Sequence, residues 1–130
     1  VSASVMRPRR RLSCCISATK RFSRTDGAYD IRVVLASPDT SAEMCRPLVT
    51  RGTLSCRNGD AAVLTMYRWT KATPDFPDRD VYRQYVVNHE VGHALGHGHE
   101  QCPGRGKLAP VMMQQTKGIG ACRANPWPFP

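Results

Sequence analysis

The chain lacks the long apolar runs that membrane-spanning helices need. No segment of its 130 residues approaches the roughly 20 consecutive apolar residues that cross a bilayer. Residues 1–24 also lack the apolar stretch of about 7–15 residues found in secretory signals. We therefore expect one domain of ordinary size, with no transmembrane segment and no signal peptide visible in this chain.

Acidic residues are absent from residues 1–24, which hold seven lysines and arginines. Residues 25–130 hold 12 basic and 10 acidic side chains, so the formal net charge of +9 comes mostly from the first segment. No other basic stripe is interleaved with aromatic residues, the usual sign of nucleic-acid recognition. We expect residues 1–24 to be a basic, poorly ordered leader and residues 25–130 a single domain without a specific nucleic-acid partner. The alternative is a binder of nucleic acid or anionic surfaces led by residues 7–24.

The C-x-x-C pairs of thiolate zinc sites are also missing, although the chain has six cysteines. Cys45 and Cys56 flank a short loop, and Cys102 and Cys122 bracket a segment rich in proline and glycine. We expect these residues to form two disulfides in that order, tying down the two loops. Disulfides persist in oxidising compartments, which predicts a secreted or extracytoplasmic protein. The alternative is a set of reduced, mostly buried thiols.

Histidine is scarce, and the four histidines of the chain all lie in the eleven residues HEVGHALGHGH at 89–99. A helix places the first two imidazoles of H-E-x-x-H one above the other on a single face. Gly96 can adopt the left-handed conformation that ends a helix and reverses the chain. The reversal would return His99 to the cation held by His89 and His93. Three neutral imidazoles leave one tetrahedral position of Zn²⁺ open, which is typical of a catalytic site.

The pattern thus predicts one Zn²⁺ per chain, bound by His89, His93 and His99. Glu90 follows the first ligand directly and is the candidate general base for a metal-bound water. Iron or cobalt would also suit three imidazoles. His97 stands between two glycines, so we interpret it as a loop residue, with an exchange of roles with His99 as the alternative.

Five segments have the apolar spacing of regular secondary structure. They are a strand at 29–36, a helical turn at 41–44, hairpin arms at 53–56 and 61–69, and a helix at 79–95. The Asn58-Gly59 pair predicts a tight turn between the two hairpin arms. In the helix, the 4-3-4 spacing of Tyr82, Val86, His89 and His93 places both ligands on the buried face. Asp78 is its expected N-cap.

Residues 89–99 resemble, in full, the zinc signature of the metzincin metallopeptidases, and PVMM at 110–113 resembles the methionine turn of that clan. Residues 85–130 resemble more narrowly a bacterial domain family of unknown function described as predicted secreted zinc metallopeptidases. The matching segments are VVNHEVGHALGHGH, PVM followed by QQTKG, and NPWP, and DIRVVLASPDT and LSCRNG resemble the family as well. The resemblance covers roughly residues 25–130 and leaves out the first 24.

The resemblance implies an α+β fold with a metzincin-like zincin core, in which a small mixed or antiparallel sheet packs on the active-site helix. It implies zinc on His89, His93 and His99, Glu90 as the base, and Met112 beneath the site, with Met113 as the alternative. We also expect hydrogen-bond acceptors that orient the ligand imidazoles. The candidates are Asn88, Gln114 and Gln115.

The function expected from these residues is zinc-dependent hydrolysis of peptide bonds. A metal-activated water would attack the carbonyl of a peptide or protein substrate, and Glu90 would take up its proton. We expect a monomer. Two alternatives are a non-catalytic binding module organised by zinc and a hydrolase of another amide, such as a cell-wall crosslink.

Overall fold

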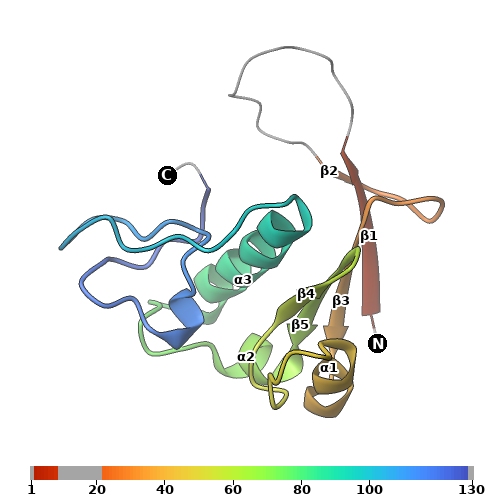
Figure 1. The fold of residues 1–130 in the computed structure, drawn as a ribbon, viewed down its shortest axis with the longest axis horizontal. Coiled ribbons are helices and arrows are strands. Elements are labelled where there is room, and N and C mark those ends of the chain that lie inside the picture. The colour runs from red at the N-terminus through yellow and green to blue at the C-terminus, as the bar shows by residue number, and fades with distance from the viewer. Residues whose placement is uncertain (1, 9–21, 129–130) are drawn as a thin grey trace.

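The computed structural model describes residues 2–8 and 22–128 of the chain. Within these residues the elements are β1 (Ser2–Pro8), β2 (Phe22–Arg24), β3 (Ile31–Ala36), α1 (Pro38–Met44), β4 (Cys56–Asn58), β5 (Ala61–Thr65), α2 (Met66–Lys71), α3 (Arg79–Ala94) and the 3-10 turn η1 (Gln115–Lys117). Figure 1 shows α3 lying between the sheet and the C-terminal segment. The predicted α+β class, with a small mixed sheet packed on the histidine-bearing helix, is confirmed.

The five strands form one sheet in the order β2-β1-β3-β5-β4. The β3 and β5 strands run parallel, and the other neighbouring pairs are antiparallel. Every residue of β5 is buried, because α1 and α3 both pack against this strand. Parallel strands covered by helices have continuous rather than alternating apolar sequences, which accounts for the unbroken run at 61–64.

Several predicted elements differ from the structure in their bounds. The hairpin arm expected at 53–56 is β4 at Cys56–Asn58, and the strand expected at 29–36 begins at Ile31. The helical turn expected at 41–44 is the seven-residue helix α1, which begins at Pro38 because proline suits the first turn of a helix and Ser37 caps it. The strand expected at 61–69 was wrong beyond Thr65. There the Thr65 hydroxyl accepts a hydrogen bond from the Tyr67 N–H at 3.3 Å and caps helix α2.

Residues 1–24, which we set apart from the domain as a leader, contain two strands of the sheet. The β1 strand pairs antiparallel with β3 along residues 2–6, and β2 pairs with β1. Strand pairing satisfies backbone N–H and C=O groups and does not need an alternating apolar pattern, which is why composition did not indicate it. The predicted disorder of residues 1 and 9–21 lies outside the described residues.

Helix α3 is held by an aromatic cluster at the centre of the core. The Phe76 ring lies 5.3 Å from that of Tyr82, edge to face, and 5.2 Å from that of Tyr85, stacked. Such pairs contribute about 0.5–1.5 kcal/mol beyond their buried area. The helix begins as predicted, with the Asp78 carboxylate accepting from the Val81 N–H at 2.8 Å. This packing sets the rotation of α3 and therefore the direction of its histidines.

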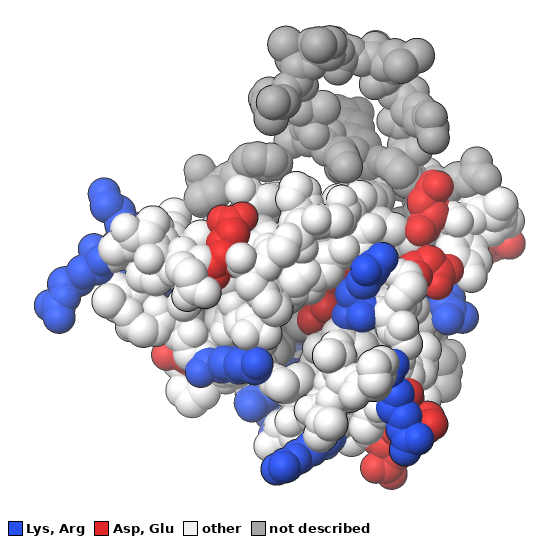
Figure 2. Space-filling view, viewed as in Figure 1, with Lys and Arg blue, Asp and Glu red and all other residues white. Residues whose placement is uncertain are grey.

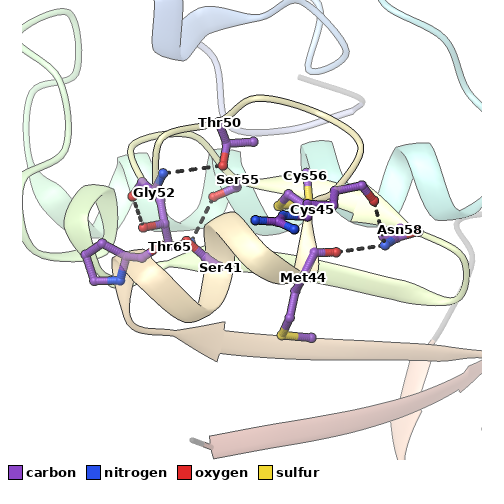
Figure 3. Close-up of a disulfide and its surroundings, with 11 residues drawn as sticks. Ser41, Met44, Cys45, Thr50, Gly52, Ser55, Cys56, Asn58 and Thr65 are labelled. Carbon is purple, nitrogen blue, oxygen red and sulfur yellow. Dashed lines mark hydrogen bonds between the residues drawn. A yellow bond between two sulfur atoms is a disulfide. The ribbon is translucent and has the colours of Figure 1, made fainter.

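Both predicted disulfides, Cys45–Cys56 and Cys102–Cys122, are confirmed. Figure 3 shows the first one joining the end of α1 to β4, beside the hydrogen bond that Asn58 donates to the Met44 carbonyl at 2.7 Å. Two disulfides in a chain of this size indicate an oxidising environment. Among the described residues, no helix has the length and apolar character to span a membrane.

Charged side chains are dispersed on one face of the described protein. On the face shown in Figure 2, lysine and arginine side chains are scattered and interleaved with acidic ones. Two described ion pairs, Arg46 with Glu43 and Arg83 with Asp80, each join neighbouring turns of one chain segment. Exposed pairs of this kind add little stability, so the fold depends on its apolar core and disulfides.

Replacing Cys45 and Cys56 together by alanine is expected to lower the free energy of unfolding by about 3 kcal/mol. The bridge closes a loop with a sequence separation of 11 residues, and chain entropy gives about that loss for such a loop. Chemical denaturation of the oxidised proteins measures the difference. With both proteins reduced, the difference should nearly vanish; a difference that persists under reduction would contradict the entropic origin.

Candidate metal centre

Three histidine side chains converge at the C-terminal end of α3. The Nε2 atom of His93 lies 3.1 Å from that of His89 and 3.0 Å from that of His99. The ligand atoms of all three lie within 4.8 Å of one another. This group can hold a metal ion. The structure therefore brings together the three predicted ligands, two from one face of the helix and one from the chain that follows it.

The chain reversal that returns His99 to the helix is a Schellman turn. Gly96 has a φ of +92°, its N–H donates to the His93 carbonyl, and the His97 N–H donates to the Gly92 carbonyl, both at 3.0 Å. This pair of bonds defines the motif, and glycine is favoured at its left-handed position. The prediction for Gly96 is confirmed. His97 lies in the loop and outside the triad, as predicted.

The imidazoles are oriented by backbone carbonyls. The Nδ1 atom of His89 lies 2.8 Å from the Val111 oxygen, and Nδ1 of His93 lies 2.9 Å from the His97 oxygen. Because a carbonyl only accepts, each Nδ1 carries the proton, and each Nε2 of the neutral ring presents a lone pair to the centre. Lone pairs about 3 Å apart repel one another unless a cation lies between them, so this donor set fits a metal.

The predicted orienting side chains have other roles. Asn88 donates to the Pro126 carbonyl at 2.8 Å, and the Gln114 side-chain oxygen accepts from Lys117 at 3.3 Å. Gln115 is fully buried and bonds to Pro110 and Asn125. The prediction was wrong because the true acceptors are main-chain atoms, which any residue supplies.

A buried pair that the sequence analysis missed holds the segment beneath the site. The Gln115 side chain donates to the Asn125 carbonyl at 2.8 Å and accepts from the Asn125 N–H at 2.9 Å. Asn125 also donates to the Ala109 carbonyl at 2.9 Å. The asparagine of the NPWP segment carried a signal, because a polar residue among prolines often binds backbone groups. This network fixes the loop that supplies the Val111 carbonyl.

Met112, rather than Met113, packs beneath the helix. Its side chain is buried, and its Sδ lies against Gly92, where an added Cβ would overlap the sulfur. Met113 instead contributes its carbonyl oxygen, which accepts from the Tyr85 hydroxyl at 3.0 Å. Gly92 thus allows the methionine to approach the helix between His89 and His93.

Glu90 is a buried acid with an unsatisfied oxygen. The residue is 5 % exposed, and its Oε2 has no hydrogen-bond partner among the described residues. Burial raises the pKa of its carboxyl to about 8. An unpaired buried carboxyl is unfavourable for folding, and an acid with a pKa perturbed in this way is a candidate functional group.

Burial also affects the histidines. It lowers the pKa of His89 to about 4, and although the bond to Val111 opposes this shift, the charges of His93 and His99 add to it. The pKa of His99 is lowered by burial, by His93 and by Lys117. A low pKa keeps these rings neutral near pH 7, the form that binds metals.

A small hollow opens beside this centre. It has a volume of about 50 Å³, and its lining includes His89, Glu90, Tyr85, Val86 and Lys117. A ligand group entering it would therefore touch both the helix α3, which carries His89 and His93, and the η1 turn.

Comparison with known families adds one match. A family model described as "Protein of unknown function (DUF3152)" matches residues 7–121. The match includes part of the segment 1–24 that the sequence resemblance left out. No curated protein and no solved structure matches the chain. The chemistry of the site therefore has to be argued from its own residues.

Substituting Gly92 by alanine is expected to lower the free energy of unfolding by about 1–3 kcal/mol, the usual effect of overpacking. The new methyl group would meet the buried sulfur of Met112, although alanine normally stabilises a helix interior. Gly98→Ala is the matched control, since its Cβ would meet open space. Equal thermal unfolding midpoints for the two variants would contradict the packing.

Proposed function

The chain belongs to the DUF3152 family of proteins of unknown function, and we propose that it is a zinc-dependent peptidase of the metzincin type. The observation that carries this proposal is the convergence of three imidazoles beside a buried carboxyl, one oxygen of which has no partner among the described residues. His89 and Glu90 line one hollow, so a substrate placed there meets both. We also propose that the protein is secreted, which the two disulfides support.

The donor set favours zinc over harder cations. Imidazole nitrogens suit Zn²⁺, whereas Mg²⁺ and Ca²⁺ prefer oxygen ligands. His89, His93 and His99 would hold the ion, and three protein ligands are typical of catalytic zinc. Zinc in such a site supplies Lewis acidity, which polarises a carbonyl and brings the pKa of a bound water to about 7. The Val111 and His97 carbonyls keep the imidazoles in the tautomer that binds metal.

Glu90 is the proposed general base. Its Oε2 has no hydrogen-bond partner among the described residues, so the ionised form of the carboxyl can accept a proton from the attacking water. The carboxyl then returns this proton to the amine nitrogen that leaves as the peptide bond breaks. A site that only organises the fold has no use for a buried, unpaired acid, which argues against the non-catalytic binding module.

Two features of the surroundings support the metzincin type. The Schellman turn at Gly96 returns the third histidine within six residues of the second, and Met112 packs under the helix at Gly92. The methionine acts by packing, since its sulfur contacts the helix backbone between the two ligands. It keeps the floor of the site rigid, which favours a preorganised ligand geometry.

Glu90→Gln is expected to lower kcat/KM on a cleaved peptide by about 10²–10⁴-fold, the contribution of general acid–base catalysis. Zinc content should stay near one ion per chain, because Glu90 is not a ligand. Peptide cleavage followed by mass spectrometry, with elemental analysis, gives both quantities. Glu100→Gln is the matched control, since Glu100 is an exposed acid at the end of the same motif. Full turnover by Glu90→Gln would refute its role as the base.

His99→Ala is expected to reduce bound zinc to well below one ion per chain and to abolish hydrolysis. In the unsubstituted protein, removing the metal with a chelator should lower the unfolding midpoint, and adding zinc should restore it, because a ligand that binds the folded state stabilises it. His97→Ala is the control, since only the backbone carbonyl of His97 takes part in the site. Equal loss of zinc in both variants would contradict the assigned ligand set.

A further inference from the structure

The hollow beside Glu90 has a positive charge at its rim. Its lining includes His89 and Glu90 from α3 and Lys117 from η1. Glu90 is buried and Lys117 is exposed, so the ammonium group lies toward the solvent side and the carboxyl toward the interior. We propose that Lys117 selects substrates with an aspartate or glutamate side chain next to the bond that is cut. This inference rests on the proposed peptidase function.

The charge of Lys117 is not neutralised by the described part of the protein. Its Nζ donates to the Gln114 side-chain oxygen at 3.3 Å, and this amide partner is neutral. The ion pairs formed by residues 2–8 and 22–128 involve other basic residues. An incoming carboxylate therefore meets an ammonium group that is held in position and has capacity for another acceptor.

The turn that carries Lys117 is rigidly anchored. Gln115 is fully buried and bonds through its side chain to Asn125, and its N–H donates to the Tyr85 hydroxyl at 2.8 Å. The Lys117 N–H donates to the Gln114 carbonyl at 3.0 Å. Because Tyr85 is a residue of α3, η1 and the helix keep a fixed separation. The side chain of Lys117 thus starts from a defined point at the rim of the hollow.

The other walls suit a short acidic side chain. Leu54 and Val86 offer apolar contact for its methylene groups, and Ser55 also lines the hollow. The Ser55 Oγ accepts from the Thr65 N–H at 3.2 Å, which leaves its hydroxyl hydrogen able to donate. Since one water needs about 10–15 Å³, a volume of about 50 Å³ admits a few atoms and no large aromatic group.

The position of the carboxylate follows from Lys117. Its exposed ammonium group attracts a carboxylate at the rim of the hollow, whereas the interior wall at Glu90 offers no positive charge. A carboxylate at the rim also stays hydrated, so it avoids the desolvation penalty of a buried ion. The expected preference for an acidic over a neutral side chain is about five-fold, the effect of one good solvent-exposed ion pair.

The test uses peptides that differ only at the two residues flanking the scissile bond, with Asp and Glu compared against their neutral isosteres Asn and Gln, and against Lys. The zinc-loaded protein should show a kcat/KM about five-fold higher for the acidic peptides at low ionic strength. Lys117→Met should remove this ratio, and Lys117→Glu should reverse it toward Lys. Salt should weaken the preference, because exposed charges are screened.

Lys107→Met is the matched control, because Lys107 is an exposed lysine of the same C-terminal segment that does not line the hollow. It should keep the full preference. An unchanged ratio in Lys117→Met, or an equal loss in Lys107→Met, would overturn the inference while leaving the peptidase function intact.

A binding measurement separates this inference from the proposed function. Calorimetry with zinc-loaded Glu90→Gln should give a dissociation constant about five-fold lower for the acidic peptide than for its neutral isostere, and Lys117→Met should remove the difference. Equal constants would overturn the role of Lys117. Failure of the unsubstituted protein to cleave any peptide would refute the peptidase function, even if acidic peptides bind more tightly.

Discussion

The candidate metal centre depends on two backbone carbonyls that orient the His89 and His93 rings, with their Nε2 atoms 3.1 Å apart. The Nδ1 atoms of His89 and His93 are each hydrogen-bonded to a backbone carbonyl oxygen. Neither ring can therefore turn its Nε2 away without losing a hydrogen bond. The His89 bond is buried, so breaking it would leave an unsatisfied carbonyl. Binding of the proposed zinc would therefore be coupled to folding, because the fold brings the donors together.

Holding these groups together requires firm packing of α3. The Phe76 ring packs on Tyr82 and Tyr85 of the helix, and the Met112 sulfur contacts the helix at Gly92. Packed interiors behave as rigid bodies because they have few voids. A helix packed in this way cannot rotate freely, so its two histidines keep their positions.

The parts of this arrangement that could be predicted are those encoded by side chains with a fixed spacing. Each of these features requires a particular side chain at a particular position in the sequence. They are the histidines His89, His93 and His99, the glycine that ends the helix, the Asp78 cap and the paired cysteines. The Val111 and His97 carbonyls leave no signal in the sequence, because every residue has a backbone oxygen. For the same reason, the pairing of β1 with β3 was invisible to composition. The predicted strand was wrong beyond Thr65, because the Thr65 hydroxyl caps a helix there. This cap favours the helix more than the weak apolar run that follows favours a strand.

The loop from Ala109 to Asn125 makes several separate contributions to the site. It supplies the carbonyl that orients His89, the methionine beneath the helix and the lysine at the rim of the hollow. The Gln115–Asn125 network and the Cys102–Cys122 disulfide hold this loop closed. A shift of this loop would move the Val111 carbonyl, which is the hydrogen-bond acceptor for His89, together with Lys117. The proposed metal geometry and the proposed substrate preference would therefore both depend on this one anchored segment.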